Sequence, residues 1–491
     1  MTVERGEDKV KSPFSIVDDQ SQTQCATALF NVTESGSALP ANQYRGNAAV
    51  ITLGCAKNQV DSEVMLGSLR NSGYQIVSDP ESAEVIIVNT CGFLESSVKE
   101  SIDCILDVAE LKKSARLRRL IVAGCMVQRY NGDIQSSFPE VDAFIGVDDL
   151  LLAGEVAQGS EVRSMLEGAA RPYFIYDEKM PRQLSTRPHT AYVKVSEGCD
   201  RPCTFCIIPK IRGAMRSRPV DSIVSEARAL ASYGVKEINL VAQDLTSYGK
   251  DRREGGDLIN LLRKLDSSSG IPWIRLLYAY PVGITAELMQ AIEQLPNICE
   301  YLDLPLQHSS EAVLRAMKRP VGRYAARPIV DLMRSCAPQV KLRTTFIVGF
   351  PGETEEDIVD LEEFISEGHF SSVGVFTYSR ESGTPAAELD NQIPEEEKEQ
   401  RRNRLMQAQQ HVVQTGLREL VGKTLPVLVE GLHEESDLLL SGRTRFQAPE
   451  VDGCVIVNDV SEESDERSIP AGEIRQVLIT DTSGYDLIGR L

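Results

Sequence analysis

The chain has 491 residues, of which 42% are hydrophobic and 25% charged, and its net charge is −20. This length predicts about three domains. An acidic surface repels bare nucleic acid and favours basic partners, so we expect no base-specific nucleic-acid binding. No apolar run reaches the ~18 residues of a membrane span, and the N-terminus lacks a secretory pattern, which predicts a cytoplasmic protein without membrane contacts.

The N-terminal third divides into a polar tail and an alternating segment. Residues 1–46 are rich in Ser, Thr, Gln and Asn without periodicity, which predicts a disordered tail. Residues 47–160 hold three apolar runs followed by helical patterns, and these runs are Ala48–Leu53, Val85–Val88 and Leu120–Ala123. Helices are expected at Asp61–Asn71 and Glu95–Lys113. Apolar strands alternating with helices predict a Rossmann-like parallel sheet.

Residues 185–416 continue the strand–helix alternation on a larger scale. Six units predict a partial (β/α)6 barrel with its chemistry at the C-terminal strand ends, followed by a charged helix from Glu395 to about Leu417. The expected strands are Ala191–Val195, Glu237–Val241, Ile274–Ala279, Tyr301–Leu304, Leu342–Val348 and Val373–Tyr378.

The last segment, residues 419–491, has short strands separated by turns and predicts a small β-barrel. Asp452-Gly453 is a hairpin-type turn signal. The expected strands are Leu425–Glu430, Leu438–Ser441, Cys454–Val457 and Val477–Thr480.

The cysteines predict thiolate metal chemistry. There are eleven, an odd number in a long chain without an export pattern, so reduced thiols or metal ligands are favoured over a disulfide framework. The five histidines show no metal-ligand spacing.

One group of three cysteines, Cys199, Cys203 and Cys206, falls within eight residues just beyond a predicted strand end. A tight loop of thiolates suits a cubane iron–sulfur cluster. A structural zinc site would need four protein ligands, so a zinc knuckle requires a distant fourth ligand. Three ligands would leave one iron open.

The spacing C-x-x-x-C-x-x-C, with Phe205 before the last cysteine, resembles the radical S-adenosylmethionine superfamily. That resemblance implies that the open iron is chelated by S-adenosylmethionine. Gln243 ends the second barrel strand, and Gly349 begins a segment similar to the one that lets the backbone approach the adenine. Gln243, Arg343 and Gly349 are therefore candidate cofactor contacts, although each also fits an ordinary loop or cap.

A second group, Cys55, Cys91 and Cys125, has one member at the end of each N-terminal strand. The carboxyl ends of parallel strands share one edge, where ligands bind, so these cysteines can converge. Free cysteines are often simply buried, but three in register on successive strands favour a ligand set.

Both groups, in this order and followed by a small TRAM-like β-barrel, resemble the radical S-adenosylmethionine methylthiotransferase family over residues 47–491. The similar stretches include Leu53–Glu63 and Asn89–Phe93, with Ala56 and Gln59 departing from the residues common in relatives. The segments that favour the RimO-type branch, which modifies small-subunit ribosomal protein S-twelve, are Tyr192–Gly213, Trp273–Pro281, Tyr301–His308 and Thr344–Thr354.

The resemblance implies an enzyme with two 4Fe-4S clusters and S-adenosylmethionine, and no catalytic residues beyond the cluster ligands. A deoxyadenosyl radical would remove hydrogen from the β-carbon of an aspartate in S-twelve, free or in the ribosome, and the second cluster would supply the methylthio group. A flavodoxin or ferredoxin is the expected low-potential electron donor.

Two alternatives remain, a transfer RNA adenosine methylthiotransferase and a non-catalytic iron–sulfur carrier. The six-unit barrel is larger than a carrier needs. Residues 421–491 hold fourteen acidic and six basic side chains, a net charge of −8, which favours a basic protein over RNA. An exposed acidic docking loop is expected at Glu462, Glu463, Asp465 and Glu466.

Overall fold

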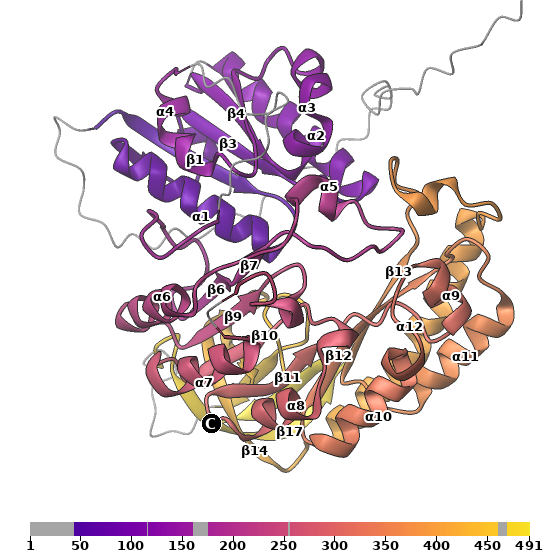
Figure 1. Ribbon diagram of the computed structural model, residues 1–491. Coiled ribbons are helices and arrows are strands. Elements are labelled where there is room, and N and C mark those ends of the chain that lie inside the picture. Colours follow the sequence, from indigo (N-terminus) through magenta and orange to yellow (C-terminus); the bar gives the residue numbers. More distant parts are fainter. Residues whose placement is uncertain (1–43, 115, 161–174, 254–255, 460–468) are drawn as a thin grey trace, which may run out of the picture.

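The computed structural model describes residues 44–114, 116–160, 175–253, 256–459 and 469–491 (Figure 1). Most of the expected disordered tail and the acidic loop at 462–466 lie outside these residues. Three folded units follow one another along the chain. None of the described helices is long and apolar enough to cross a membrane.

The first unit is a five-stranded parallel sheet in the order β2-β1-β3-β4-β5. All six residues of β3 are buried, which explains its continuous apolar sequence. The strands are β1 (Gly46–Thr52), β2 (Tyr74–Ile76), β3 (Val85–Thr90), β4 (Arg119–Gly124) and β5 (Ala143–Ile145). The helices are α1 (Ala56–Asn71), α2 (Glu95–Glu110), α3 (Cys125–Ser137) and α4 (Ala153–Ala157).

The second unit is an open sheet of six parallel strands in the order β13-β12-β11-β10-β9-β6, which confirms the predicted partial barrel. These strands are β6 (Thr190–Lys194), β9 (Glu237–Val241), β10 (Trp273–Leu276), β11 (Ile298–Asp303), β12 (Lys341–Val348) and β13 (Ser372–Thr377). The short strands β7 (Ser196–Glu197) and β8 (Arg216–Ser217) form a separate antiparallel pair.

Helices cover the outer face of this sheet and form its large apolar core. They are α6 (Val220–Ser232), α7 (Leu258–Ser268), α8 (Ala286–Gln294), α10 (Ala326–Cys336), α11 (Glu355–Ser366) and α12 (Glu395–Arg418), with the short helices α5 (Ile208–Arg212) and α9 (Glu311–Ala316). Side chains of Asp257, Thr285, Ser310 and Thr354 accept backbone N–H groups at the starts of α7, α8, α9 and α11. Such caps satisfy donors that the first helical turn leaves free.

The third unit is a closed five-stranded barrel, as predicted, in the order β14-β15-β16-β18-β17. Its strands are β14 (Thr424–His433), β15 (Ser436–Thr444), β16 (Val455–Asp459), β17 (Ile474–Ser483) and β18 (Asp486–Arg490). Asp452 and Gly453 belong to the longer connection from β15 to β16 rather than to a two-residue hairpin. A Cβ on Gly453 would lie 2.0 Å from the Tyr485 carbonyl oxygen, so close approach explains this glycine.

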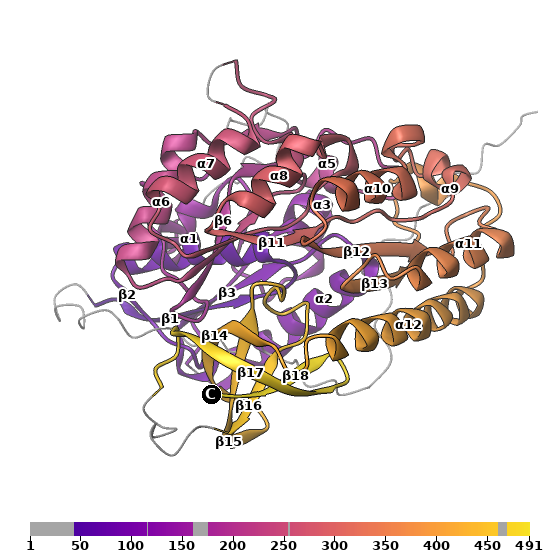
Figure 2. The ribbon, with the colours of Figure 1, turned by 90° about the horizontal axis from the view of Figure 1, so that it is seen from below.

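The barrel is attached to the sheet by buried charges. Glu237 accepts hydrogen bonds from Arg275 Nε at 2.9 Å and from Arg443 Nη1 at 3.2 Å. Arg443 Nε also donates to Glu430 in β14 at 2.9 Å. Figures 1 and 2 show the N-terminal unit on one side of the six-stranded sheet and the barrel on another. Arg443 of the barrel is therefore shared between Glu430 of the barrel and Glu237 of the sheet.

A second buried ion pair connects the N-terminal unit to the loop after β13. Arg129 in α3 donates from Nη1 to Glu381 Oε2 at 2.9 Å and to the Gly92 carbonyl at 2.9 Å. Glu381 Oε1 accepts the Glu95 N–H at 2.8 Å. This contact holds the segment that follows Cys91 against the edge of the six-stranded sheet.

Candidate cluster and cofactor site

The cysteines of the N-terminal unit converge at one edge of its sheet, and we call Cys55, Cys91 and Cys125 the N-terminal triad. Cys55 follows β1 and precedes α1, Cys91 follows β3, and Cys125 is the first residue of α3 after β4. A Cβ added to Gly54 would lie 2.9 Å from Cys91 Cβ, and one on Gly92 would lie 2.8 Å from the Cys125 carbonyl carbon. The glycines therefore allow the three segments to approach.

The thiols of this triad have different electrostatic surroundings. Burial raises the pKa of Cys125 to about 12, although Arg212 opposes the shift, and burial also raises the pKa of Cys91. For Cys55, burial is outweighed by Lys57, Arg212 and the Asn58 N–H, which together lower its pKa. In contrast to the buried Cys91 and Cys125, Cys55 retains exposed surface.

The second group, here called the loop triad, lies between β7 and α5 and comprises Cys199, Cys203 and Cys206. The Cys199 N–H donates to the Gly213 carbonyl at 3.0 Å, and the Thr204 N–H donates to the Met317 carbonyl at 3.0 Å. These bonds fix the loop against α9. All three thiols are partly accessible, and burial raises the pKa of Cys206 to about 12.

The donor sets fit iron–sulfur clusters better than single ions. Among the described residues, no three Cys, His, Asp or Glu side chains are grouped tightly enough to hold one metal ion. A structural zinc ion would draw four ligands into contact with it, whereas a cubane cluster holds its cysteines further apart. The raised pKa values of Cys91, Cys125, Cys199 and Cys206 also fit ligands that become thiolates only when a metal is bound.

Arg212 is the central polar residue between the two triads. Its Nη2 donates to Asn58 Oδ1 at 2.6 Å and to Cys125 Sγ at 3.1 Å, while Nη1 donates to Asp61 Oδ2 at 2.7 Å. Nη1 also lies 3.2 Å from Glu197 Oε2, two residues before Cys199. The guanidinium therefore joins the N-terminal triad to the strand that leads into the loop triad.

A stacked aromatic group borders the loop triad. The Tyr280 ring lies between the guanidinium groups of Arg201 and Arg319, at 4.0 and 4.2 Å from its centre. Arg201 Nε donates to Asp244 Oδ2 at 2.6 Å, and Arg319 Nη1 lies 3.9 Å from Cys203 Sγ. Two fixed positive charges therefore lie beside the thiolates of this loop.

The three candidate cofactor contacts have different surroundings. Gln243 Nε2 donates to Glu197 Oε1 at 2.6 Å, and its buried Oε1 has no hydrogen-bond partner among the residues that the structure describes. This free acceptor, next to the residues that precede Cys199, fits a ligand that brings a donor such as an ammonium group.

Arg343 and Gly349 have partners within the protein. Arg343 Nη1 donates to Asp303 Oδ1 at 2.9 Å. Its buried Nε has no hydrogen-bond partner in the described part of the chain but lies 3.7 Å from Asp452 Oδ1. The Gly349 N–H donates to Glu353 Oε1 at 2.8 Å, and a Cβ at Gly349 would lie 2.2 Å from Lys398 Cγ. Packing against Lys398 is therefore sufficient to explain this glycine.

Sequence reasoning singled out the six cysteines as candidate ligands but missed the residues that connect them: Lys57, Asn58, Glu197, Arg212 and Arg319. The run Lys57-Asn58-Gln59 beside Cys55 was an available signal, because three polar residues that begin a helix next to a ligand can face a site. Arg212 lies 154 residues from Asn58, and no local pattern predicts that pairing.

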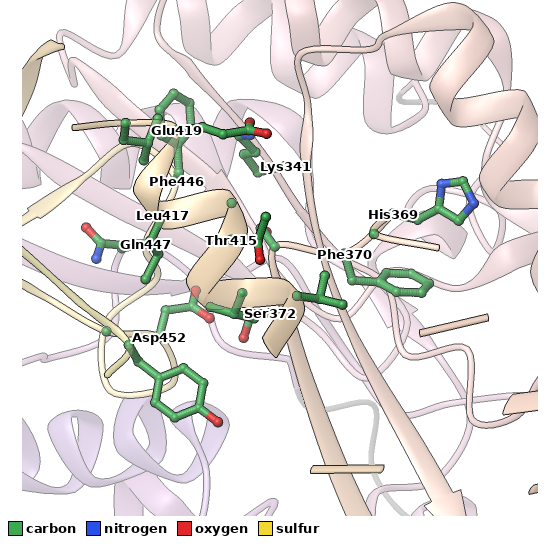
Figure 3. Close-up of a pocket in the computed structure, with 18 of the residues that line it drawn as sticks. Lys341, His369, Phe370, Ser372, Thr415, Leu417, Glu419, Phe446, Gln447 and Asp452 are labelled. Atoms are coloured by element: carbon green, nitrogen blue, oxygen red, sulfur yellow. The ribbon is translucent and has the colours of Figure 1, made fainter. Parts of the chain in front are cut away.

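A separate cavity of about 580 Å³ lies where the barrel meets α12 and the starts of β12 and β13 (Figure 3). Lys341, Ser372, Thr415 and Phe446 contribute to its lining, and no residue of either triad does. Lys341 and Ser372 begin their strands, so this cavity is at the opposite end of the sheet from the cysteine loops.

Comparisons with known proteins cover all three units. The chain matches the uncharacterized protein family UPF0004 over residues 47–146, the radical SAM superfamily over 193–365 and the TRAM domain over 421–491. It is 47% identical over 440 residues to the ribosomal protein uS12 methylthiotransferase RimO of Anaeromyxobacter sp. (strain K), covering 90% of this chain and 92% of that one. The same enzyme of Geotalea uraniireducens (strain Rf4) is 46% identical over 444 residues, covering 90% and 98%.

Among solved structures, the radical S-adenosylmethionine methyltransferase TsrM of Kitasatospora setae, with cobalamin and a 4Fe-4S cluster bound, has a similar fold. The TM-score is 0.51 at 14% identity, over 69% of this chain and 76% of that one.

Proposed function

Because the chain belongs to the family of ribosomal protein uS12 methylthiotransferases, we propose that it attaches a methylthio group to the β-carbon of an aspartate in small-subunit ribosomal protein S-twelve (uS12). Family membership makes it a radical S-adenosylmethionine enzyme with two 4Fe-4S clusters. The observation that carries the proposal is the presence of two three-cysteine sets joined by Arg212.

We assign the loop triad to the cluster that binds S-adenosylmethionine and the N-terminal triad to the cluster that carries the transferred sulfur. When bound, these groups supply the electron, the 5′-deoxyadenosyl radical and the methylthio group. The protein's own part is to hold them at a fixed separation. Arg212 does so by bonding Cys125 on one side and Glu197, next to the loop triad, on the other.

The residues around the loop triad are suited to hold S-adenosylmethionine. The free Oε1 of Gln243 is an acceptor for the amino group of the methionyl moiety. Gly349, at the end of β12, offers backbone next to the adenine, and Arg343 completes the proposed contacts from inside the same strand.

Electron entry is expected at the loop triad. Asp200 is exposed and the three cysteines of this loop keep accessible surface, so a reduced carrier can approach this cluster directly. The proposed donor is a low-potential flavodoxin or ferredoxin in the cytoplasm. The acidic barrel, with its net charge of −8, favours a basic protein as substrate.

The test uses the full chain, reconstituted with iron and sulfide under anaerobic conditions. It is incubated with S-adenosylmethionine, a reductant and either purified uS12 or transfer RNA, and the products are analysed by mass spectrometry. The proposal expects a methylthio group on one aspartate of uS12. Modification of adenosine in transfer RNA, with uS12 unchanged, would instead establish the sister activity.

A further inference from the structure

Lys57 is a buried cation for which the described residues offer no carboxylate partner. It is the second residue of α1, only 9% of its surface is exposed, and its Nζ lies 3.2 Å from the centre of the Tyr278 ring. Within the described part of the chain, no Asp or Glu lies within 4 Å of its ammonium group. Buried ammonium groups are normally paired with an anion. The neighbours that favour the charged form of Lys57 are the Tyr278 side chain and the Cys55 sulfur, so no carboxylate supplies the counter-charge.

The backbone holds Tyr278 against Lys57 at a cost. Tyr278 follows β10 with a φ of 65°, a left-handed conformation that bulky side chains rarely adopt. Its N–H donates to Asp303 Oδ2 at 3.1 Å, and Asp303 is itself fixed by Arg343. Strain of this kind persists where the surroundings enforce it and is concentrated at functional sites.

Lys57 is connected to both triads through neighbouring residues. It is two residues from Cys55, and its partner Tyr278 is two residues from Tyr280. Tyr280 lies against Arg319, which contacts Cys203. The segment 277–280 therefore runs from the N-terminal triad to the loop triad. The reacting carbon atom of the substrate must lie between the triads, because it reacts with groups held by both.

We propose that Lys57 binds the side-chain carboxylate of the substrate aspartate and thereby selects an acidic residue for methylthiolation. The inference rests on the proposed function and adds a specificity-determining residue to it. The reacting β-carbon is bonded directly to the carboxylate carbon, so fixing the carboxylate also fixes the carbon that loses hydrogen. A carboxylate would give Lys57 a charge-assisted hydrogen bond, whereas the neutral amide of asparagine would not.

The experiment is a double-substitution cycle on the anaerobically reconstituted enzyme. Wild type and Lys57→Met are each titrated with purified uS12 and with uS12 whose modified aspartate is replaced by asparagine. A buried charge-assisted hydrogen bond predicts that the asparagine form binds wild type roughly 10- to 100-fold more weakly. Lys57→Met should bind the aspartate form more weakly by a similar factor and should no longer distinguish the two forms.

Matched variants separate this role from others. Lys57→Arg should retain part of the discrimination, and Lys99→Met, at an exposed position of α2, should behave as wild type. Iron content is measured for every variant, and if Lys57→Met loses iron, Lys57→Gln carries the test.

Three results would overturn the inference. Lys57→Met could distinguish aspartate from asparagine as well as wild type does, or wild type itself could fail to distinguish them. Lys57→Met could also weaken S-adenosylmethionine binding in equilibrium dialysis while leaving the discrimination intact, which would assign the ammonium to the methionyl carboxylate. If the wild-type enzyme does not modify uS12, the proposed function is refuted instead. Mass spectrometry of uS12 measures this outcome independently of the binding titrations.

Discussion

Replacing Arg212 by methionine should destabilise the packing of the N-terminal unit on the six-stranded sheet. Arg212 and Lys194 neutralise Asp61 and Glu197 in a group whose side chains are at most 8% exposed. Without the arginine, one lysine faces two buried carboxylates, and breaking a buried ion pair from one side costs about 3–5 kcal/mol. We expect a loss of that size in the free energy of unfolding.

The single tryptophan provides the assay. Trp273 is 3% exposed and belongs to the apolar cluster that the sheet shares with α1, through residues such as Val64 and Leu69. Urea unfolding of the metal-free protein, followed by tryptophan fluorescence, therefore reports on this interface. Adding Glu197→Gln to Arg212→Met should recover part of the loss, because it removes the unpaired charge. The exposed Arg228→Met is the control, with an expected effect within about 0.5 kcal/mol. A loss below about 1 kcal/mol for Arg212→Met would refute the reasoning.

Three further predictions concern the clusters, the barrel and substrate docking. Changing all three cysteines of either triad to alanine should remove one of the two clusters, measured as iron content; a variant with full iron would contradict that ligand assignment. The effect of burial on Glu430 is outweighed by His189 and Arg443, which lower its pKa from 4.5 to about 2. The ionised carboxylate therefore contributes about 3 kcal/mol to the free energy of unfolding above pH 4.5, and this contribution is lost as the pH falls towards 2. Acid unfolding of Glu430→Gln should show a correspondingly smaller decline over that range, and an unchanged decline would count against this role. Binding of uS12 should weaken as the salt concentration rises. This salt dependence should become less steep when the four carboxylates Glu462, Glu463, Asp465 and Glu466 are changed to amides. An unchanged salt dependence would show that these residues have no docking role.

The sequence predicted the fold well where apolar patterns are long. The six sheet strands, the charged helix α12 and the closed barrel were all expected. The short strands β2, β5 and β18 were not, because three to five residues at a sheet edge or chain end give little periodicity.

Helix α1 was expected to begin at Asp61 but begins at Ala56. Its first turns carry Lys57, Asn58 and Gln59, which are polar and buried because they contact other units. A pattern that assigns polar residues to solvent cannot recognise such a turn.

The two sets of three cysteines could be singled out as candidate ligands because strand-end position and spacing are properties of the local sequence. The residues that place the two triads relative to each other could not. Arg212 and Asn58 meet only after two units have packed, and so do Lys57 and Tyr278. Their chemistry becomes evident from burial and from missing partners, which the sequence does not contain.

The ion pair between Arg129 and Glu381 has a consequence for the enzyme's assembly. It fastens the segment after Cys91 to the far edge of the sheet, and in the packed state Cys91 and Cys125 are only 9% and 6% exposed. A delivery protein carrying a preformed cluster needs access to these thiols. Cys55 alone of this triad is exposed, so we expect a cluster delivered to the folded chain to meet Cys55 first and to reach Cys91 and Cys125 only when this contact opens.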